Sequence, residues 1–244
     1  MPESCYNCGA PAASKEHAPP ECFFPENYRV GLVTVPSCAE HNNELSQDVE
    51  YVRNNICGQR GTNLVALKVF YDQARASFEH SPKLAARTFA GLREITVVEG
   101  VTGAYRIELP RFKRVIKAIA YATYYLDFGK PNEGDFDVFS TSLSSASHLY
   151  EHKPDGYEEL RRVIAASAFK SMPVPQPKVF KYGMTKVGEG QVHYHFQFYE
   201  GFDVYALTLP YRLSSSLYLP VTNDCTVFRL GRGYQRNAHR LSNP

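Results

Sequence analysis

Residues 5–51 read CYNCGAPAASKEHAPPECFFPENYRVGLVTVPSCAEHNNELSQDVEY, and they decide the interpretation of the chain. Four side chains that can bind zinc occur in two pairs, Cys5 with Cys8 and Cys38 with His41. The gap in each pair is short enough for both side chains to face one ion. We therefore expect a structural Cys3His zinc site. Such a site stabilises a small module with little core, because metal binding contributes directly to its folding free energy.

Between and after the two pairs lie residues suited to phosphate chemistry. Glu16 and His17 are neighbours, directly before Pro19 and Pro20, and Asn42 follows the second pair. A histidine can accept a proton from water near neutral pH. A carboxylate and an amide oxygen are ligands that a hard divalent cation prefers. We expect residues 13–17 and 29–35 to form strands and residues 38–56 to form a helix that holds Asn42.

With these motifs the stretch resembles the HNH endonuclease family, the ββα-metal nucleases, in its zinc-bearing subgroup. The resemblance covers about 55 residues and is carried by the two zinc-ligand pairs, by the Glu-His pair before Pro-Pro, and by the Asn after the second pair. The chain departs from the family pattern at three positions. The family's middle Asn falls near Gly31, and Asn27 is the candidate substitute. Glu16 replaces an Asp, and His41 replaces a fourth Cys.

The resemblance implies roles for the individual residues. Cys5, Cys8, Cys38 and His41 would hold structural Zn2+, and Glu16 and Asn42 would hold a catalytic Mg2+ or Mn2+. His17 would be the general base that activates water for attack on phosphorus. The implied activity is endonucleolytic hydrolysis of DNA, with RNA left open, and the implied setting is defence against phage or mobile DNA.

The rest of the chain predicts a second unit, so the fold class is α+β. The zinc-stapled ββα module is assigned to residues 1–58, and a mixed helical and antiparallel-sheet domain of unassigned role to residues 61–244. Five regions of that domain have distinctive patterns. They are a long helix over residues 61–91 that Pro82 divides, a hairpin near residues 93–109, a helix from Pro110 to Gly129, a helix over about 155–169, and an antiparallel meander from Lys178 onward.

Charge is distributed unevenly between the two units. The net charge of the chain is +2, yet residues 1–60 hold four Lys and Arg against eight Asp and Glu. Residues 61–244 therefore carry the positive balance and are expected to attract a polyanion. A basic rim on the helix after Pro110, formed by Arg111, Lys113, Arg114 and Lys117, is the candidate nucleic-acid contact. A solvated helix face is the alternative reading.

Composition also limits location and partners. No apolar run approaches the length of a membrane span, and the N-terminal residues do not read as a signal peptide. A cytoplasmic location without a membrane partner is expected. A non-catalytic zinc module that binds nucleic acid or a protein is the rival function. A third reading is a nuclease that stays silent until a protein partner or a second copy engages residues 61–244.

Overall fold

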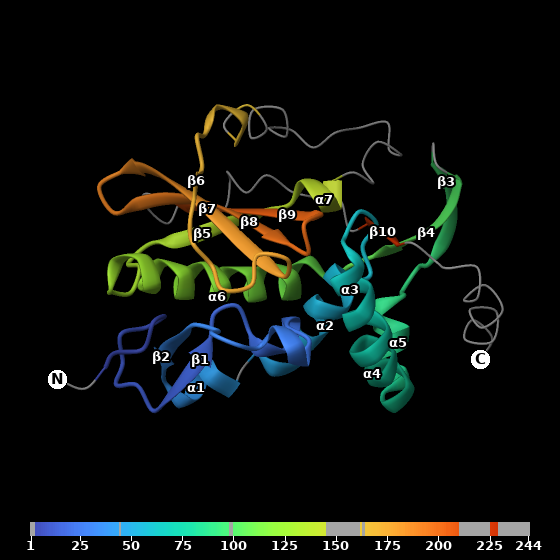
Figure 1. Cartoon of the computed structure of the whole chain (residues 1–244), viewed down its shortest axis with the longest axis horizontal. Coiled ribbons are helices and arrows are strands. Elements are labelled where there is room, and N and C mark those ends of the chain that lie inside the picture. The colour runs from blue at the N-terminus through green and yellow to red at the C-terminus, as the bar shows by residue number, and fades with distance from the viewer. Residues whose placement is uncertain are drawn as a thin grey trace.

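The computed structural model describes residues 3–43, 45–97, 100–144, 162, 164–209 and 225–228. It is a mixed α+β fold in which helices pack on antiparallel sheets (Figure 1). This agrees with the expected fold class at the level of α+β. Among the described residues, no helix combines the length and apolar character that a membrane crossing would need.

The N-terminal segment folds as a hairpin followed by helices. Strands β1 and β2 pair antiparallel, with Glu16 opposite Val35 and His17 opposite Thr34. The elements are β1 (Ser14–His17), the 3-10 helices η1 (Glu21–Phe23) and η2 (Glu26–Tyr28), β2 (Thr34–Ser37), α1 (Ala39–Asn43) and α2 (Ser46–Cys57). The expected order of strand, loop, strand and helix is observed.

Two boundaries in this segment differ from the prediction. The second strand begins at Thr34 rather than near Arg29, because Gly31 adopts a φ of +74° and bends the chain away from an extended path. The predicted single helix is two helices, and Leu45 between them has φ −103° and ψ 0°. Helix α1, which carries His41 and Asn42, is therefore only five residues long.

The helical middle of the chain is divided where its sequence indicates. Its elements are α3 (Leu64–Val69), the π-helical η3 (Phe70–Ala74), α4 (Arg75–His80) and α5 (Pro82–Thr88). Pro82 occupies the first turn of α5, and the Ser81 side chain accepts a hydrogen bond from the Leu84 backbone N–H. Proline and a serine cap together start a new helix here, as predicted.

Helix α6 (Leu109–Phe128) is the longest described helix and lies along one face of the large sheet (Figure 1). Pro110 lies in its first turn, and Gly129 ends it in the left-handed conformation at φ 69°. Val115, Ile116 and Ile119 are buried. The expected helix is thus confirmed, with its apolar side against the core.

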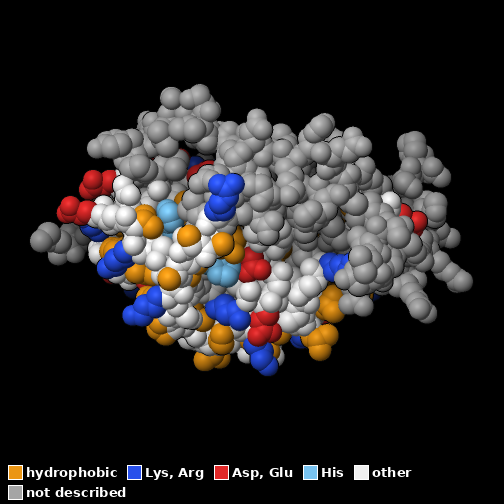
Figure 2. Space-filling model, turned by 90° about the horizontal axis from the view of Figure 1, so that it is seen from above, with side chains coloured by type: hydrophobic (Ala, Val, Ile, Leu, Met, Phe, Trp, Pro, Cys, Tyr) orange, Lys and Arg blue, Asp and Glu red, His pale blue; other side chains and the backbone are white. Residues whose placement is uncertain are grey.

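The large sheet is antiparallel throughout and has the strand order β5-β9-β8-β7-β6. Its strands are β5 (Asp135–Phe139), β6 (Lys170–Ser171), β7 (Phe180–Gly188), β8 (Gln191–Phe198) and β9 (Phe202–Leu209). The meander predicted from Lys178 onward is confirmed over β7, β8 and β9. Seen from above, the face away from α6 carries basic, hydrophobic and histidine side chains close together (Figure 2).

A smaller sheet with the order β10-β4-β3 completes the described strands. It contains β3 (Arg93–Val97), β4 (Gly100–Arg106) and β10 (Cys225–Phe228), and α7 (Thr141–Ser144) follows β5. The predicted hairpin is confirmed. Of the helix expected over 155–169, only residue 162 and residues 164–166 are described as helical, and its start lies outside the described residues.

One hydrophobic cluster contains residues from both sides of the predicted boundary between 58 and 61. The Phe23 ring lies 5.3 Å from that of Phe198, and the Tyr199 hydroxyl donates a 2.6 Å hydrogen bond to the Phe23 carbonyl. Asn63 joins the same region, since its backbone N–H donates to the Tyr199 carbonyl at 2.9 Å. The segment before residue 58 therefore shares its core with the sheet that follows.

Candidate metal centre

The four predicted zinc ligands converge. The ligand atoms of Cys5, Cys8, Cys38 and His41 all lie within 4.8 Å of one another. The Cys8 and Cys38 sulfurs are 3.9 Å apart, and His41 Nδ1 is 3.7 Å from the Cys5 sulfur and 3.1 Å from the Cys38 sulfur. Two ligand pairs that are thirty or more positions apart in the chain thus form one cluster.

The local backbone conformation directs both side chains of each ligand pair toward the cluster. The first pair lies in a tight turn, in which the Gly9 N–H donates to the Cys5 carbonyl at 3.0 Å and Gly9 has φ +74°. The second pair lies at the start of α1, where the Asn42 N–H donates to the Cys38 carbonyl at 3.1 Å. Residues three apart on a helix share a face, so Cys38 and His41 point the same way.

Electrostatics favour a thiolate at Cys5. Burial raises the pKa of its thiol, but hydrogen bonds from the backbone of Cys8, Asn7 and Cys38 outweigh burial and lower the pKa to about 7. Thiolate is the form that binds metal. The turn therefore stabilises the ionisation state that a cation requires.

The cluster fits zinc in chemistry and in spacing. A tetrahedral ion with Zn–S bonds of about 2.3 Å and a Zn–N bond of about 2.0 Å has ligand atoms roughly 3.5–3.8 Å apart. The observed separations of 3.1, 3.7 and 3.9 Å are close to that range. Cys5, Cys8, Cys38 and His41 are therefore close enough to bind a metal ion such as zinc.

Glu16 lies next to this cluster. Its carboxylate is bound by Tyr6, which stands between Cys5 and Cys8 in the sequence. The Tyr6 hydroxyl donates a 3.0 Å hydrogen bond to Glu16 Oε2. Burial raises the pKa of the Glu16 carboxyl, against the lowering effects of the Tyr6 hydrogen bond and of nearby His41. The Tyr6 side chain is buried in a small core with Cys5, Ala18, Val35 and Ala122. The carboxylate is therefore fixed relative to the metal centre.

His17 and Asn42 do not contact Glu16 through a hydrogen bond. His17 is half-buried and follows Glu16 on β1, where successive side chains point to opposite faces. Asn42 is exposed on α1. The structure brings the four zinc ligands together, while the catalytic roles of Glu16, His17 and Asn42 stay predictions.

The four basic side chains predicted to contact nucleic acid all have acidic partners within the protein. Asp48 on α2 pairs with both Arg111 and Arg114. On β5, Asp137 lies 3.4 Å from Lys113, and Asp135 lies 2.7 Å from Lys117. These pairs join α6 to α2 and to the sheet. Contact with nucleic acid stays a prediction, and any phosphate would compete with these carboxylates.

Sequence reasoning missed two features of the site region. One is Tyr6. It stands between Cys5 and Cys8 in the sequence, and nothing in that position indicated that its hydroxyl donates to Glu16 on β1. The other is Arg87 on α5, which meets Glu108 and lines a cavity of about 540 Å³ together with Asp48 and Arg111. Glu16 is ten positions from Tyr6 and Glu108 is twenty-one from Arg87, so neither contact follows from helix or strand spacing.

No family model, no curated protein and no solved structure matches the chain. Function is therefore inferred from the arrangement of the side chains.

Proposed function

We propose that the chain is an HNH-type endonuclease that hydrolyses phosphodiester bonds in DNA, with structural zinc and catalytic Mg2+ or Mn2+. One observation carries the proposal: the convergence of Cys5, Cys8, Cys38 and His41 at the junction of the β1-β2 hairpin with α1. Glu16 and His17 are on that hairpin, and Asn42 is on that helix. A zinc ion at the junction would fix the three residues relative to one another.

In the proposed reaction each residue has a separate task. His17 accepts a proton from the attacking water. Glu16 and Asn42 offer oxygen ligands, the donor type that Mg2+ and Mn2+ prefer. A divalent cation there supplies positive charge beside the phosphate. Tyr6 orients the Glu16 carboxylate, and the zinc ligands orient the helix that bears Asn42.

A plasmid-nicking assay with zinc-loaded protein tests this proposal. We expect nicking with Mg2+ or Mn2+ by the wild type and a loss of at least about a hundredfold in His17→Ala, since a general base contributes roughly 10²–10⁴-fold. His80→Ala is the matched control, because His80 is an exposed histidine at the end of α4, and it should nick like the wild type.

The rival function is a non-catalytic zinc module that binds nucleic acid or a partner protein. The hydrogen bond from Tyr6 to Glu16 favours it, because it occupies a lone pair of the carboxylate that a cation could otherwise use. No nicking by either protein at any metal concentration, with or without candidate partner proteins, would decide for the rival. Equal nicking by wild type and His17→Ala would overturn the role of His17 as general base. Nicking that appears only after a partner protein is added would identify a nuclease activated through residues 61–244, and so would support the proposal. Such a nuclease would suit the defence role implied by the resemblance.

A further inference from the structure

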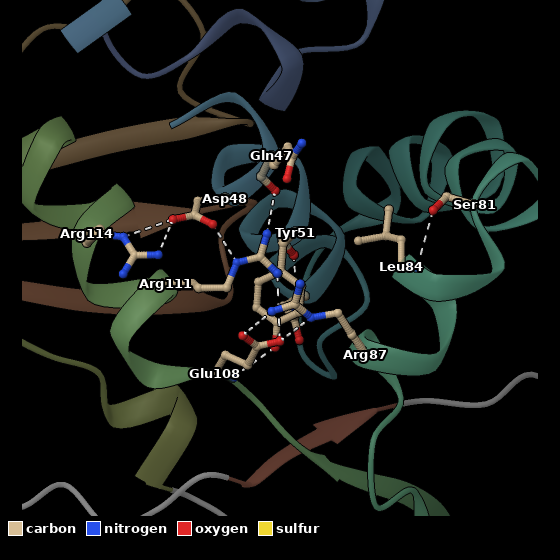
Figure 3. Close-up of polar contacts among 10 residues, drawn as sticks. Gln47, Asp48, Tyr51, Ser81, Leu84, Arg87, Glu108, Arg111 and Arg114 are labelled. Atoms are coloured by element: carbon tan, nitrogen blue, oxygen red, sulfur yellow. Dashed lines mark hydrogen bonds and ion pairs between the residues drawn. The ribbon is translucent and has the colours of Figure 1, made fainter. Parts of the chain in front are cut away.

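A second cluster of charged residues lies away from the metal centre, where α2, α5 and α6 meet (Figure 3). Opposite charges alternate along it. Arg87 pairs with Glu108, Glu108 lies 3.7 Å from Arg111, and Arg111 and Arg114 share Asp48. Three guanidinium groups thus meet two carboxylates, so the cluster retains one positive charge.

The cluster lines a cavity of about 540 Å³ that is open to solvent. Arg111 is 7% exposed and lies at its floor, with its guanidinium carbon 4.3 Å from the centre of the Tyr51 ring. Arg111 Nη1 is buried without a hydrogen-bond partner. The side chains of Arg87 and Arg114 are 58% and 53% exposed, so they stand where a solute would enter.

Two helices begin at the same cavity. Gln47 and Asp48 belong to the first turn of α2, and Leu109 and Pro110 to the first turn of α6. The first turn of a helix carries N–H groups without helical acceptors and the positive end of the helix dipole. Both helix starts therefore add to the positive potential that the three arginines create.

We propose that this cavity is a binding site for a small phosphorylated anion, held by Arg87, Arg111 and Arg114. A guanidinium group can donate parallel hydrogen bonds to phosphate oxygens. Arg111 lies over the Tyr51 ring, and its buried Nη1 is the donor left for a phosphate oxygen. The ligand would take over part of the coordination that Glu108 now supplies. A free or terminal phosphate can reach the buried Arg111, whereas a duplex presents its phosphates on a convex surface. The site does not depend on the nuclease proposal.

The test is calorimetric titration of the zinc-loaded full chain with inorganic phosphate and with pyrophosphate. No other divalent cation is added, and sodium chloride keeps the ionic strength constant. We expect one saturable site. Arg87→Gln and Arg114→Gln should each weaken it by about tenfold or more, since each removes a charge-assisted hydrogen bond. Arg75→Gln, which removes an exposed, ion-paired arginine outside the cavity, should bind like the wild type.

The Glu108→Gln variant distinguishes an anion-binding site from an ion network that only stabilises the fold. If the cavity binds anions, removing a competing carboxylate should strengthen the binding of pyrophosphate. Circular dichroism establishes that each variant is folded. No saturable binding of either anion would overturn the proposal, as would binding that is unchanged in Arg87→Gln and Arg114→Gln. Arg87-dependent binding of a short DNA duplex without binding of either small anion would also overturn it, and would assign the cavity to a nucleic-acid backbone.

Discussion

At the scale of single residues, Tyr6 is the contact that joins the metal centre to the proposed active site. It lies between two zinc ligands, is 1% exposed, and donates its hydroxyl proton to Glu16. A half-buried carboxylate that loses its donor keeps the cost of desolvation without the compensating bond. Tyr6 therefore matters to Glu16 although it offers no ligand to the zinc.

Tyr6→Phe should lower the free energy of unfolding of the zinc-loaded protein by about 1–3 kcal/mol, because it leaves Glu16 without its hydrogen bond. Urea denaturation followed by circular dichroism measures this. Tyr71→Phe, at a tyrosine 52% exposed, is the control and should change little. An unchanged urea midpoint in Tyr6→Phe would show that the hydrogen bond contributes nothing.

Among the described glycines, Gly201 is the one at which an added Cβ would meet the nearest atom. A Cβ at this position would lie 2.0 Å from the carbonyl oxygen of Gly61, which is a backbone atom. Gly201→Ala should therefore destabilise the protein by about 2 kcal/mol or more, since the two chain segments must separate. At Gly188 a Cβ would meet only the flexible end of Gln191, so Gly188→Ala is the control in the same urea assay. Equal midpoints for the two variants would contradict the prediction.

At the scale of elements, Asp48 joins α2 to α6. Burial raises the pKa of its carboxyl, but hydrogen bonds from Arg111 and Arg114 outweigh burial and lower it. The Arg111 and Asp48 side chains are only 9% and 13% exposed, so solvent screens this pair little. The contact decides how the helix that follows the metal centre packs on the longest described helix.

Asp48→Asn should lower the free energy of unfolding by about 3–5 kcal/mol at pH 7, because it leaves the buried Arg111 charge without the Asp48 carboxylate. A lowered folded-state pKa contributes stability above the unfolded pKa of about 3.9, and that stability is lost as pH falls through the folded pKa. The difference in the free energy of unfolding between Asp48→Asn and wild type should therefore shrink below about pH 4. Urea unfolding at pH 7 and pH 3 measures it.

Asp72→Asn is the matched control for that experiment, since Asp72 forms an exposed i,i+4 pair with Lys68. Such a pair contributes roughly 0.3–0.5 kcal/mol. Two results would contradict the assigned role of Asp48. The free energy of unfolding of Asp48→Asn could differ from that of wild type by an equally small amount, or the difference could stay constant between pH 7 and pH 3.

The sequence predicted those elements whose signals are local. Pro82, Pro110 and Gly129 mark helix ends through their own backbone preferences, and the zinc ligands are recognisable because each pair is close in sequence. The prediction was wrong about the start of β2 because the run before Thr34 is β-rich, yet Gly31 turns the chain. The meeting of Arg87 with Glu108 depends on tertiary packing, so no local pattern indicated it.

At the scale of the whole molecule, the loop between β1 and β2 connects the N-terminal segment to the large sheet. Phe23, from the segment between β1 and β2, packs on Phe198 of the large sheet. Residues on both sides of the predicted boundary therefore contribute to one core. The metal centre packs on a second, smaller cluster, which includes Ala122 of α6.

Removing zinc should lower the thermal midpoint of the whole protein in a single transition, because the loop between β1 and β2 belongs to the same core as the sheet. Thermal melting with and without a chelator, followed by circular dichroism, measures this. A separate low-temperature transition, with the main one unchanged, would instead show that residues 1–58 unfold independently.

We infer that the two ligand pairs form one zinc site and that this site organises the N-terminal segment. Zinc K-edge X-ray absorption of the purified protein tests it most directly, with Cys38→Ser as the ligand variant and Cys22→Ser as the control outside the cluster. We predict one zinc per chain with three sulfurs at about 2.3 Å and one nitrogen at about 2.0 Å, lost or altered only in Cys38→Ser. Less than one equivalent of zinc in the wild type, or a first shell unchanged by Cys38→Ser, would contradict the claim.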